Sequence, residues 1–313
     1  MKLPQIVAEY LTHRRALGNR FVAEGYILRS FCGHVGRSAL NTVSGDVMKA
    51  FLVRPGTKLE TAARRRRVLK GLFRFAQTRG YDRPPQLPAL ARTPKSTFVP
   101  FIYTTAQLRQ LLAASSAICS VRGSLIEDYA LRALLLTLYG AALRLGEVIH
   151  LDEVDVDLNE AVLTIRQTKF FKTRLVPMGR DLTRVLVDYR KQRDRCHRRS
   201  ADEAFFCLRN NARMNKPVIE RTFRRLRAAA GLVRDGGPRH QPRLHDLRHA
   251  GAVHRLLRWY RAGADLQALL PRLATYLGHK DLVSTQHYLT MTPQLLRTAG
   301  RRFERYARES RHD

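Results

Sequence analysis

The sequence predicts a mainly α-helical protein that carries a small antiparallel β-sheet and is divided into two domains. Apolar residues recur at helical spacing almost throughout residues 1–80 and again beyond Thr104. Short β-branched runs bounded by turn residues occur from Val154 to Pro177. The proline-rich stretch before Phe101 has few periodic apolar positions, which is typical of an extended linker. We therefore expect a helical domain at 1–82, a linker at 83–100 and a mixed α/β domain at 101–313.

The composition points to a polyanionic partner. Lysine and arginine number 57 against 26 acidic residues, a formal net charge of +31, and nucleic acid is the leading candidate. A membrane surface is the competing candidate, but no apolar run approaches the roughly 20 residues of a spanning helix. The N-terminus lacks the features of a secretory signal. The four cysteines contain no C-x-x-C pair, which favours free thiols in a reducing compartment. We expect an intracellular, cytoplasmic protein with no membrane partner.

The N-terminal domain is predicted to contain about four helices, the last of which carries four consecutive arginines. This helix is expected to open with a capping box between Thr57 and Glu60 and to close at Gly80. Residues 1–99 hold 19 basic and 5 acidic residues, a net charge of +14. Four consecutive side chains cannot all face one way on a helix, so some are expected to be merely solvated. We predict a phosphate-binding face that includes Arg64, Arg65, Arg66 and Arg67.

The second domain is predicted to bury a very apolar helix from Tyr129 to Leu143. Arg144 would then lie at the end of a core helix, where an unpaired charge is costly, and Glu147 is a candidate partner. Three strands follow at 154–157, 161–165 and 174–177, with Lys169 at the tip between the second and third. The remaining expected elements are a helix after Thr104, helices at about 181–195 and 216–230, a short strand at 205–208, and a helix that starts near residue 243 after Pro242.

A cluster of polar residues near the C-terminus has a spacing that suits phosphate chemistry. On a helix, His245, Arg248 and His249 stand at i, i+3 and i+4 and share one face, so they can converge on an anion. Tyr288 follows and offers a hydroxyl nucleophile. For any one of these residues, an ordinary polar helix face with a core tyrosine is the better interpretation. Only the whole set in so basic a chain favours attack on a phosphodiester.

Five sequence boxes in order resemble those of the tyrosine recombinase (phage integrase, Xer-like) family, and the resemblance covers nearly the whole chain. They are Ala142-Leu143-Arg144-Leu145-Gly146-Glu147, the lysine box from Thr168 to Pro177, His245-Asp246-Leu247-Arg248-His249, Leu277-Gly278-His279, and Ser284-Thr285 ahead of Tyr288. The resemblance implies a SAM-like helical core-binding domain followed by an α/β catalytic domain.

The resemblance also implies roles for particular residues. Arg144 and Arg248 would hold the charge of the transition state through paired hydrogen bonds, and Tyr288 would be the nucleophile. His245 would take or share the tyrosine proton, His279 would donate to a phosphate oxygen, and Lys169 would protonate the departing 5′ oxygen. Lys172 and Arg174, in the lysine box, are expected to contact DNA. No cofactor, ATP or metal is expected, since the carboxylates of a two-metal site do not cluster near these boxes.

By this resemblance the protein is expected to recombine double-stranded DNA as a homotetramer on two sites, with or without a second recombinase. Two alternatives stay open. A type IB topoisomerase-like or telomere-resolving enzyme would cut through the same tyrosine without pairing two sites. A non-catalytic DNA-binding accessory protein would keep the fold and form no covalent adduct.

Overall fold

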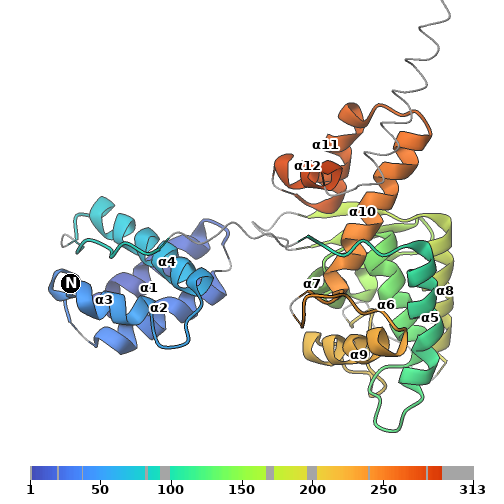
Figure 1. Cartoon of the computed structure of the whole chain (residues 1–313), viewed down its shortest axis with the longest axis horizontal. Helices are drawn as coiled ribbons and strands as arrows, with labels where there is room; N and C mark the ends of the chain where they lie inside the picture. The colour runs from blue at the N-terminus through green and yellow to red at the C-terminus, as the bar shows by residue number, and fades with distance from the viewer. Residues whose placement is uncertain are drawn as a thin grey trace, which may run out of the picture. The chain divides into compact units, whose positions relative to one another are not determined.

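The computed structural model describes two compact units, which divide after residue 97 (Figure 1). The residues described are 2–19, 21–36, 38–81, 84–91, 99–166, 173–195, 203–238, 240–279 and 281–290. Within them the chain is mainly helical with one three-stranded antiparallel sheet, so the predicted fold class is confirmed. None of the helices in these ranges is both long and apolar enough to cross a membrane.

The N-terminal unit is a helical bundle whose apolar faces meet in one core that includes Ile6, Leu28, Phe51 and Leu72. Its elements are α1 (Leu3–Ala16), α2 (Val22–Val35), the 3₁₀-helix η1 (Leu40–Thr42), α3 (Gly45–Leu52) and α4 (Leu59–Thr78). The four predicted α-helices are therefore present in the described residues.

The two ends of α4 differ in how well they were predicted. The helix ends as expected, because Gly80 adopts a φ of 70° and the Tyr81 amide closes back on the carbonyl of Ala76. The predicted capping box at the start is wrong. The chain enters the helix at Lys58, one residue later than a Thr57 cap requires. The Thr57 hydroxyl is instead within 3.5 Å of Arg65 Nη1.

The C-terminal unit combines a set of packed helices with a small sheet. Its helices are α5 (Thr105–Cys119), α6 (Asp128–Gly140), α7 (Leu145–Ile149), the 3₁₀-helix η2 (Glu153–Asp155), α8 (Arg180–Arg193), α9 (Lys216–Ala229), α10 (Leu244–Arg261), α11 (Leu266–Leu277) and α12 (Val283–Thr290). Helices α11 and α12 lie beside the C-terminal part of α10 (Figure 1). A second apolar cluster joins these three helices, and Tyr288 belongs to it.

The sheet is formed by β1 (Val156–Asp157), β2 (Val162–Ile165) and β3 (Arg174–Pro177) in the order β1-β2-β3. Both pairings are antiparallel, as predicted, and Ile165 lies opposite Arg174 at one end of the β2–β3 pair. The segment that joins these two strands, with Lys169 and Lys172, lies outside the described residues.

Two local predictions about this unit are wrong. The apolar helix expected to reach Leu143 ends at Gly140, and Ala142 then adopts a φ of 50°, which turns the chain out of the helix. The expected strand at 205–208 is reduced to two isolated bridges that flank the fully buried Phe205 and Phe206. An apolar run buried on both sides fits either a strand or core packing, and here the aromatic rings fill the core.

Helices α6 and α10 pack unusually closely at Gly251. A Cβ atom at this position would lie 2.1 Å from the carbonyl oxygen of Tyr139. Gly251→Ala should therefore force the helices apart and destabilise the protein by about 1–3 kcal/mol, which corresponds to roughly 2–4 °C in Tm per kcal/mol for a unit of this size. Thermal unfolding measures it. The control is Gly33→Ala, at a helical glycine with no atom within 4 Å of the added methyl, which should not lower Tm. An equal Tm for both variants would contradict the close packing.

Candidate functional site

A cavity of about 300 Å³ in the C-terminal unit collects most of the residues predicted to be catalytic. It is lined by Arg144, His245, Arg248, His249, His279, Ser284 and Tyr288. Five of the six predicted catalytic residues are therefore brought together, and the sixth, Lys169, lies outside the described residues. His249 was predicted to share one helix face with His245 and Arg248 but was given no catalytic role. Ser284 was predicted only as part of a sequence box.

Two helices that supply this cavity begin with the same contact. At the start of α10, Asp246 accepts hydrogen bonds from the backbone amide of Arg243 at 2.9 Å and from its Nη2 at 3.0 Å. At the start of α7, Glu147 accepts from the backbone amide of Arg144 at 2.9 Å and from its Nη1 at 2.8 Å. An acid at the third helical position thus fixes both helix starts. Arg144 precedes a new helix instead of ending the apolar one.

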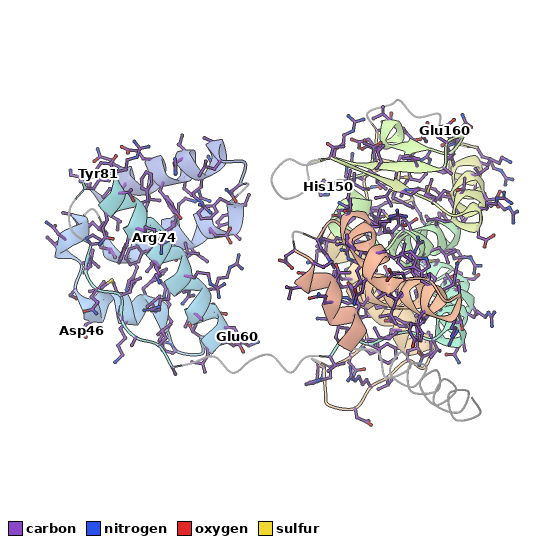
Figure 2. The ribbon with its side chains drawn as sticks, turned by 90° about the horizontal axis from the view of Figure 1, so that it is seen from above. Asp46, Glu60, Arg74, Tyr81, His150 and Glu160 are labelled. Atoms are coloured by element: carbon purple, nitrogen blue, oxygen red, sulfur yellow. The ribbon has the colours of Figure 1, made fainter. Side chains whose placement is uncertain are left out.

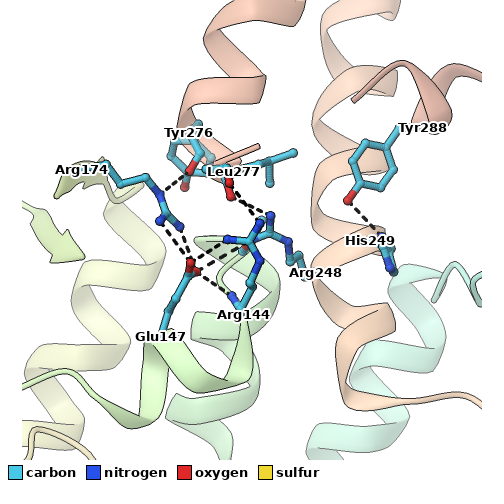
Figure 3. Close-up of polar contacts among 10 residues, drawn as sticks. Arg144, Glu147, Arg174, Arg248, His249, Tyr276, Leu277 and Tyr288 are labelled. Carbon is cyan, nitrogen blue, oxygen red and sulfur yellow. Dashed lines mark hydrogen bonds and ion pairs between the residues drawn. The ribbon is translucent and has the colours of Figure 1, made fainter. Parts of the chain in front are cut away.

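Glu147 pairs with Arg144, as predicted. Two further arginines also approach its carboxylate. Arg174 donates to both of its carboxylate oxygens, at 3.1 Å and 2.9 Å, and Arg248 Nη1 lies 3.8 Å from Oε2 (Figure 3). Burial alone would raise the pKa of Glu147, but the hydrogen bond and charge of Arg174, followed by those of Arg144, hold it below its usual value. The carboxylate is therefore ionised and gives the guanidinium groups a fixed partner.

Arg248 is held from both sides and is only 1% exposed. It donates from Nη1 to the carbonyl oxygen of Ala142 and from Nη2 to that of Leu277, both at 2.7 Å. Arg144 is more open, with 42% of its side chain exposed, and its Nη2 donates to the carbonyl oxygen of Gly278 at 3.0 Å. Both guanidinium groups thus bind carbonyl oxygens at the C-terminal end of α11, and Arg144 is the more exposed of the two.

Tyr288 points into the cavity and is 3% exposed. Its hydroxyl lies 3.0 Å from Nδ1 of His249 (Figure 3). The His279 ring stacks against the Tyr288 ring. Nδ1 of His279 lies 2.8 Å from the hydroxyl of the buried Thr285. If this hydroxyl donates, the other ring nitrogen of His279 carries the proton and can donate into the cavity. His245 stands at the exposed start of α10, edge-on to the ring of His249.

The cavity lowers the pKa of its histidines. Burial, followed by the charges of His245 and Arg248, lowers the pKa of His249 from 6.5 to about 3. Burial and the charges of Arg248 and Arg144 lower the pKa of His279 to about 4. Both imidazoles are therefore neutral at pH 7 and can accept at one nitrogen and donate at the other. Burial raises the pKa of the Tyr288 hydroxyl, and the charge of Arg248 opposes this only in part.

The predicted DNA-binding arginines of α4 do not act as one group. Arg65 donates to the carbonyl oxygen of Phe51 at 3.0 Å, and Arg66 donates to that of Pro88 at 2.8 Å, so both side chains serve the fold of their own unit. Arg64 is exposed and pairs with Glu24 at 3.1 Å. Arg67 is exposed and has no hydrogen-bond or ion-pair partner among the described residues.

An exposed basic stripe runs along α4 instead of the consecutive run. Arg67 is followed at helical spacing by the exposed Lys70 and Arg74, and Arg74 is labelled on this helix in Figure 2. Lys70 and Arg74 were not predicted as site residues, although their helical spacing from Arg67 indicates that the three side chains share one face.

Arg174 was predicted to contact DNA, but its side chain is 11% exposed and binds Glu147. Lys172, the other residue predicted for this role in the lysine box, lies outside the described residues. Within the described ranges, no group of three His, Cys, Asp or Glu side chains is arranged to hold a metal ion.

Comparisons with known proteins identify the family of this chain. The sequence profile of the phage integrase family matches residues 103–294. The integrase/recombinase y4rB of Sinorhizobium fredii is 35% identical over 307 residues, covering 96% of each chain. The tyrosine recombinase XerD of Ralstonia nicotianae is 31% identical over 270 residues, covering 84% of this chain and 80% of its own. The crystal structure of a lambda integrase tetramer bound to a Holliday junction aligns with a TM-score of 0.62 at 17% identity, covering 92% of this chain and 77% of that chain. Since the profile covers more than half of the chain and y4rB is similar over nearly its full length, this chain belongs to the phage integrase family of tyrosine recombinases.

Proposed function

We propose that this protein cleaves and rejoins double-stranded DNA through a covalent 3′-phosphotyrosine at Tyr288 and exchanges strands between two sites. The observation that carries this proposal is the cavity itself. It places one tyrosine hydroxyl beside two arginines and three histidines that come from distant parts of the chain.

The chemistry follows from the charges. When the Tyr288 oxygen attacks the scissile phosphorus, negative charge grows on the nonbridging oxygens, and Arg144 and Arg248 stabilise it. The new O–P bond forms as the bond to the 5′ oxygen breaks, and that oxygen leaves with a proton. The family resemblance assigns this proton to Lys169. Because one phosphoester replaces another, the reverse attack by a 5′ hydroxyl rejoins the strand without ATP.

The tyrosine proton needs an acceptor, because burial raises the pKa of Tyr288. His249 accepts a hydrogen bond from the hydroxyl in its neutral form and so fixes the direction of the oxygen, but the low pKa of His249 makes it a weak base. His245, at the cavity entrance, remains our candidate for taking the proton. His279, supported by Thr285, is our candidate for donating to a phosphate oxygen.

Part of the DNA binding is assigned to the N-terminal unit. The α4 stripe of Arg67, Lys70 and Arg74 offers phosphate contacts in the N-terminal unit, and the exposed Arg64 extends it. Assembly as a homotetramer on two DNA sites is supported by the likeness to lambda integrase, whose tetramer binds a Holliday junction.

The proposal is tested by covalent capture. The protein is incubated with EDTA and without ATP on DNA that carries its recombination site, nicked so that the cleaved strand diffuses away. We expect a complex that survives denaturation, and mass spectrometry of its peptides should place the phosphoester on Tyr288. DNA binding without any adduct would favour an accessory protein. Relaxation of supercoiled DNA by a monomer, without paired sites, would favour a topoisomerase.

A further inference from the structure

Arg174 lies outside the cavity lining, yet its side chain joins two segments that build the cavity (Figure 3). It begins β3, and its Nη1 and Nη2 donate to Oε1 and Oε2 of Glu147 at 3.1 Å and 2.9 Å. Its Nε donates to the carbonyl oxygen of Tyr276 at 3.2 Å. One guanidinium therefore holds the start of α7 and the end of α11 together.

Three arginines share the end of α11 in a regular way. The successive carbonyl oxygens of Tyr276, Leu277 and Gly278 accept from Arg174, Arg248 and Arg144, respectively. The last carbonyls of a helix have no partner within it and carry partial negative charge, so cations at this end are stabilising. Each carbonyl is bound by an arginine from a different part of the sequence, and His279 follows immediately.

The packing below this turn is tight. Gly278 has a φ of 66°, and a Cβ atom there would lie 2.8 Å from Nη1 of Arg174. The guanidinium therefore lies directly against the turn that leads to His279. A shorter or non-planar group at position 174 would leave the turn unsupported on this side.

Glu147 transmits the position of Arg174 to Arg144. Arg174 occupies one side of the carboxylate with two parallel hydrogen bonds, which fixes its plane. The same two oxygens accept from the backbone amide and Nη1 of Arg144. A carboxylate that is free to rotate could not hold both contacts, so the direction of the Arg144 side chain depends on Arg174.

We propose that Arg174 is a positioning residue for DNA cleavage: through Glu147 it aims Arg144 at the scissile phosphate, and through the Tyr276 carbonyl it holds the turn before His279. This inference deepens the proposed function and rests on it. Arg174 acts without touching the DNA, which replaces the direct DNA contact expected from the sequence.

The first test compares Arg174→Lys with Arg166→Lys in the full-length protein. Lysine keeps the charge but cannot form the two-pronged contact with Glu147 or reach Tyr276 as well. Arg166 follows directly after β2 and pairs with Asp155, with 54% of its side chain exposed. Single-turnover cleavage at saturating DNA should fall on the order of 10²-fold for Arg174→Lys, because small displacements of a catalytic group have effects of this size. Arg166→Lys should cleave like the wild type, and DNA affinity should change in neither variant.

The second test separates aiming from general support of the fold. In a methylphosphonate, a methyl group replaces one charged nonbridging oxygen of the scissile phosphate. Because this removes negative charge that Arg144 would stabilise, cleavage depends less on the position of the Arg144 guanidinium. If Arg174 acts through Arg144, the ratio of wild-type to Arg174→Lys rates should shrink toward one on this substrate. If Arg174 only stabilises the turn, the ratio should be the same on both substrates and should follow a lowered Tm.

Wild-type cleavage by Arg174→Lys, equal ratios on the two substrates, or equal loss in Arg166→Lys would each overturn the inference. Failure of the proposed function would give a different result, because the wild-type protein would then form no adduct with the ordinary phosphate substrate. If Arg174→Lys does not fold, Arg174→Gln is measured in its place, because the glutamine amide ends near the position of Nε and keeps a donor for the carbonyl oxygen of Tyr276 while it loses the contact with Glu147.

Discussion

A Tyr288→Phe variant should bind its DNA like the wild type and form no covalent adduct at all. The substitution removes only the hydroxyl, and the ring keeps its place in the apolar cluster with Val253 and Leu256. The lost hydrogen bond to His249 should lower stability by about 1 kcal/mol. Covalent capture on the nicked substrate measures adduct formation, and a gel-shift titration measures DNA binding.

Tyr276→Phe is the matched control for this experiment. The Tyr276 hydroxyl also lies near the site, but it points away from the cavity, 3.4 Å from the carbonyl oxygens of Gly140 and Pro177. This variant should still form the adduct. Adduct formation by Tyr288→Phe, together with its loss in Tyr276→Phe, would transfer the nucleophile to Tyr276.

Arg248→Lys should lower the rate of cleavage by on the order of 10²–10³ without weakening DNA binding to the same extent. Arg248 binds the carbonyls of Ala142 and Leu277 at 2.7 Å while it faces the cavity, and a lysine ammonium cannot serve all three directions. Burial, followed by the charge of Arg144, lowers the pKa of Arg248 to about 10, so the arginine stays charged at pH 7. The same surroundings would favour a neutral lysine, which also loses the positive charge.

Single-turnover cleavage at saturating DNA measures the effect of Arg248→Lys. Arg258→Lys provides the control, because Arg258 lies on the exposed side of the last turn of α10. Near-wild-type cleavage by Arg248→Lys with cognate DNA bound would remove Arg248 from the transition state.

The parts of the site that follow from local spacing could be predicted from the sequence. The i, i+3, i+4 spacing of His245, Arg248 and His249 requires one helix face, and Pro242 marks the start of that helix. The pairing of β2 with β3 follows from two β-branched runs with a short connection. These features depend on residues that are close together in the chain.

The direction in which an arginine points could not be predicted in the same way. Arg65, Arg66 and Arg174 all turn inward because backbone carbonyls of Phe51, Pro88 and Tyr276 lie within reach in the folded chain. Those carbonyls are distant in sequence or belong to irregular segments, so a pattern of residue types does not contain them. The sequence indicated basic surface, whereas the fold decides which guanidinium groups remain on it.

The buried position of Arg248 and Tyr288 limits what the unbound protein can react with. With exposures of 1% and 3%, they present almost no surface to a small anion or a stray nucleic-acid strand in solution. A phosphodiester therefore reaches both residues only from within the cavity that they line, which has a volume of about 300 Å³. Part of the binding free energy of correct DNA would then be used to seat the scissile phosphate there, as in enzymes in which substrate binding completes the catalytic site. A poorly matched sequence that binds without seating its phosphate would be released uncut, so cleavage would discriminate between sequences more sharply than binding does.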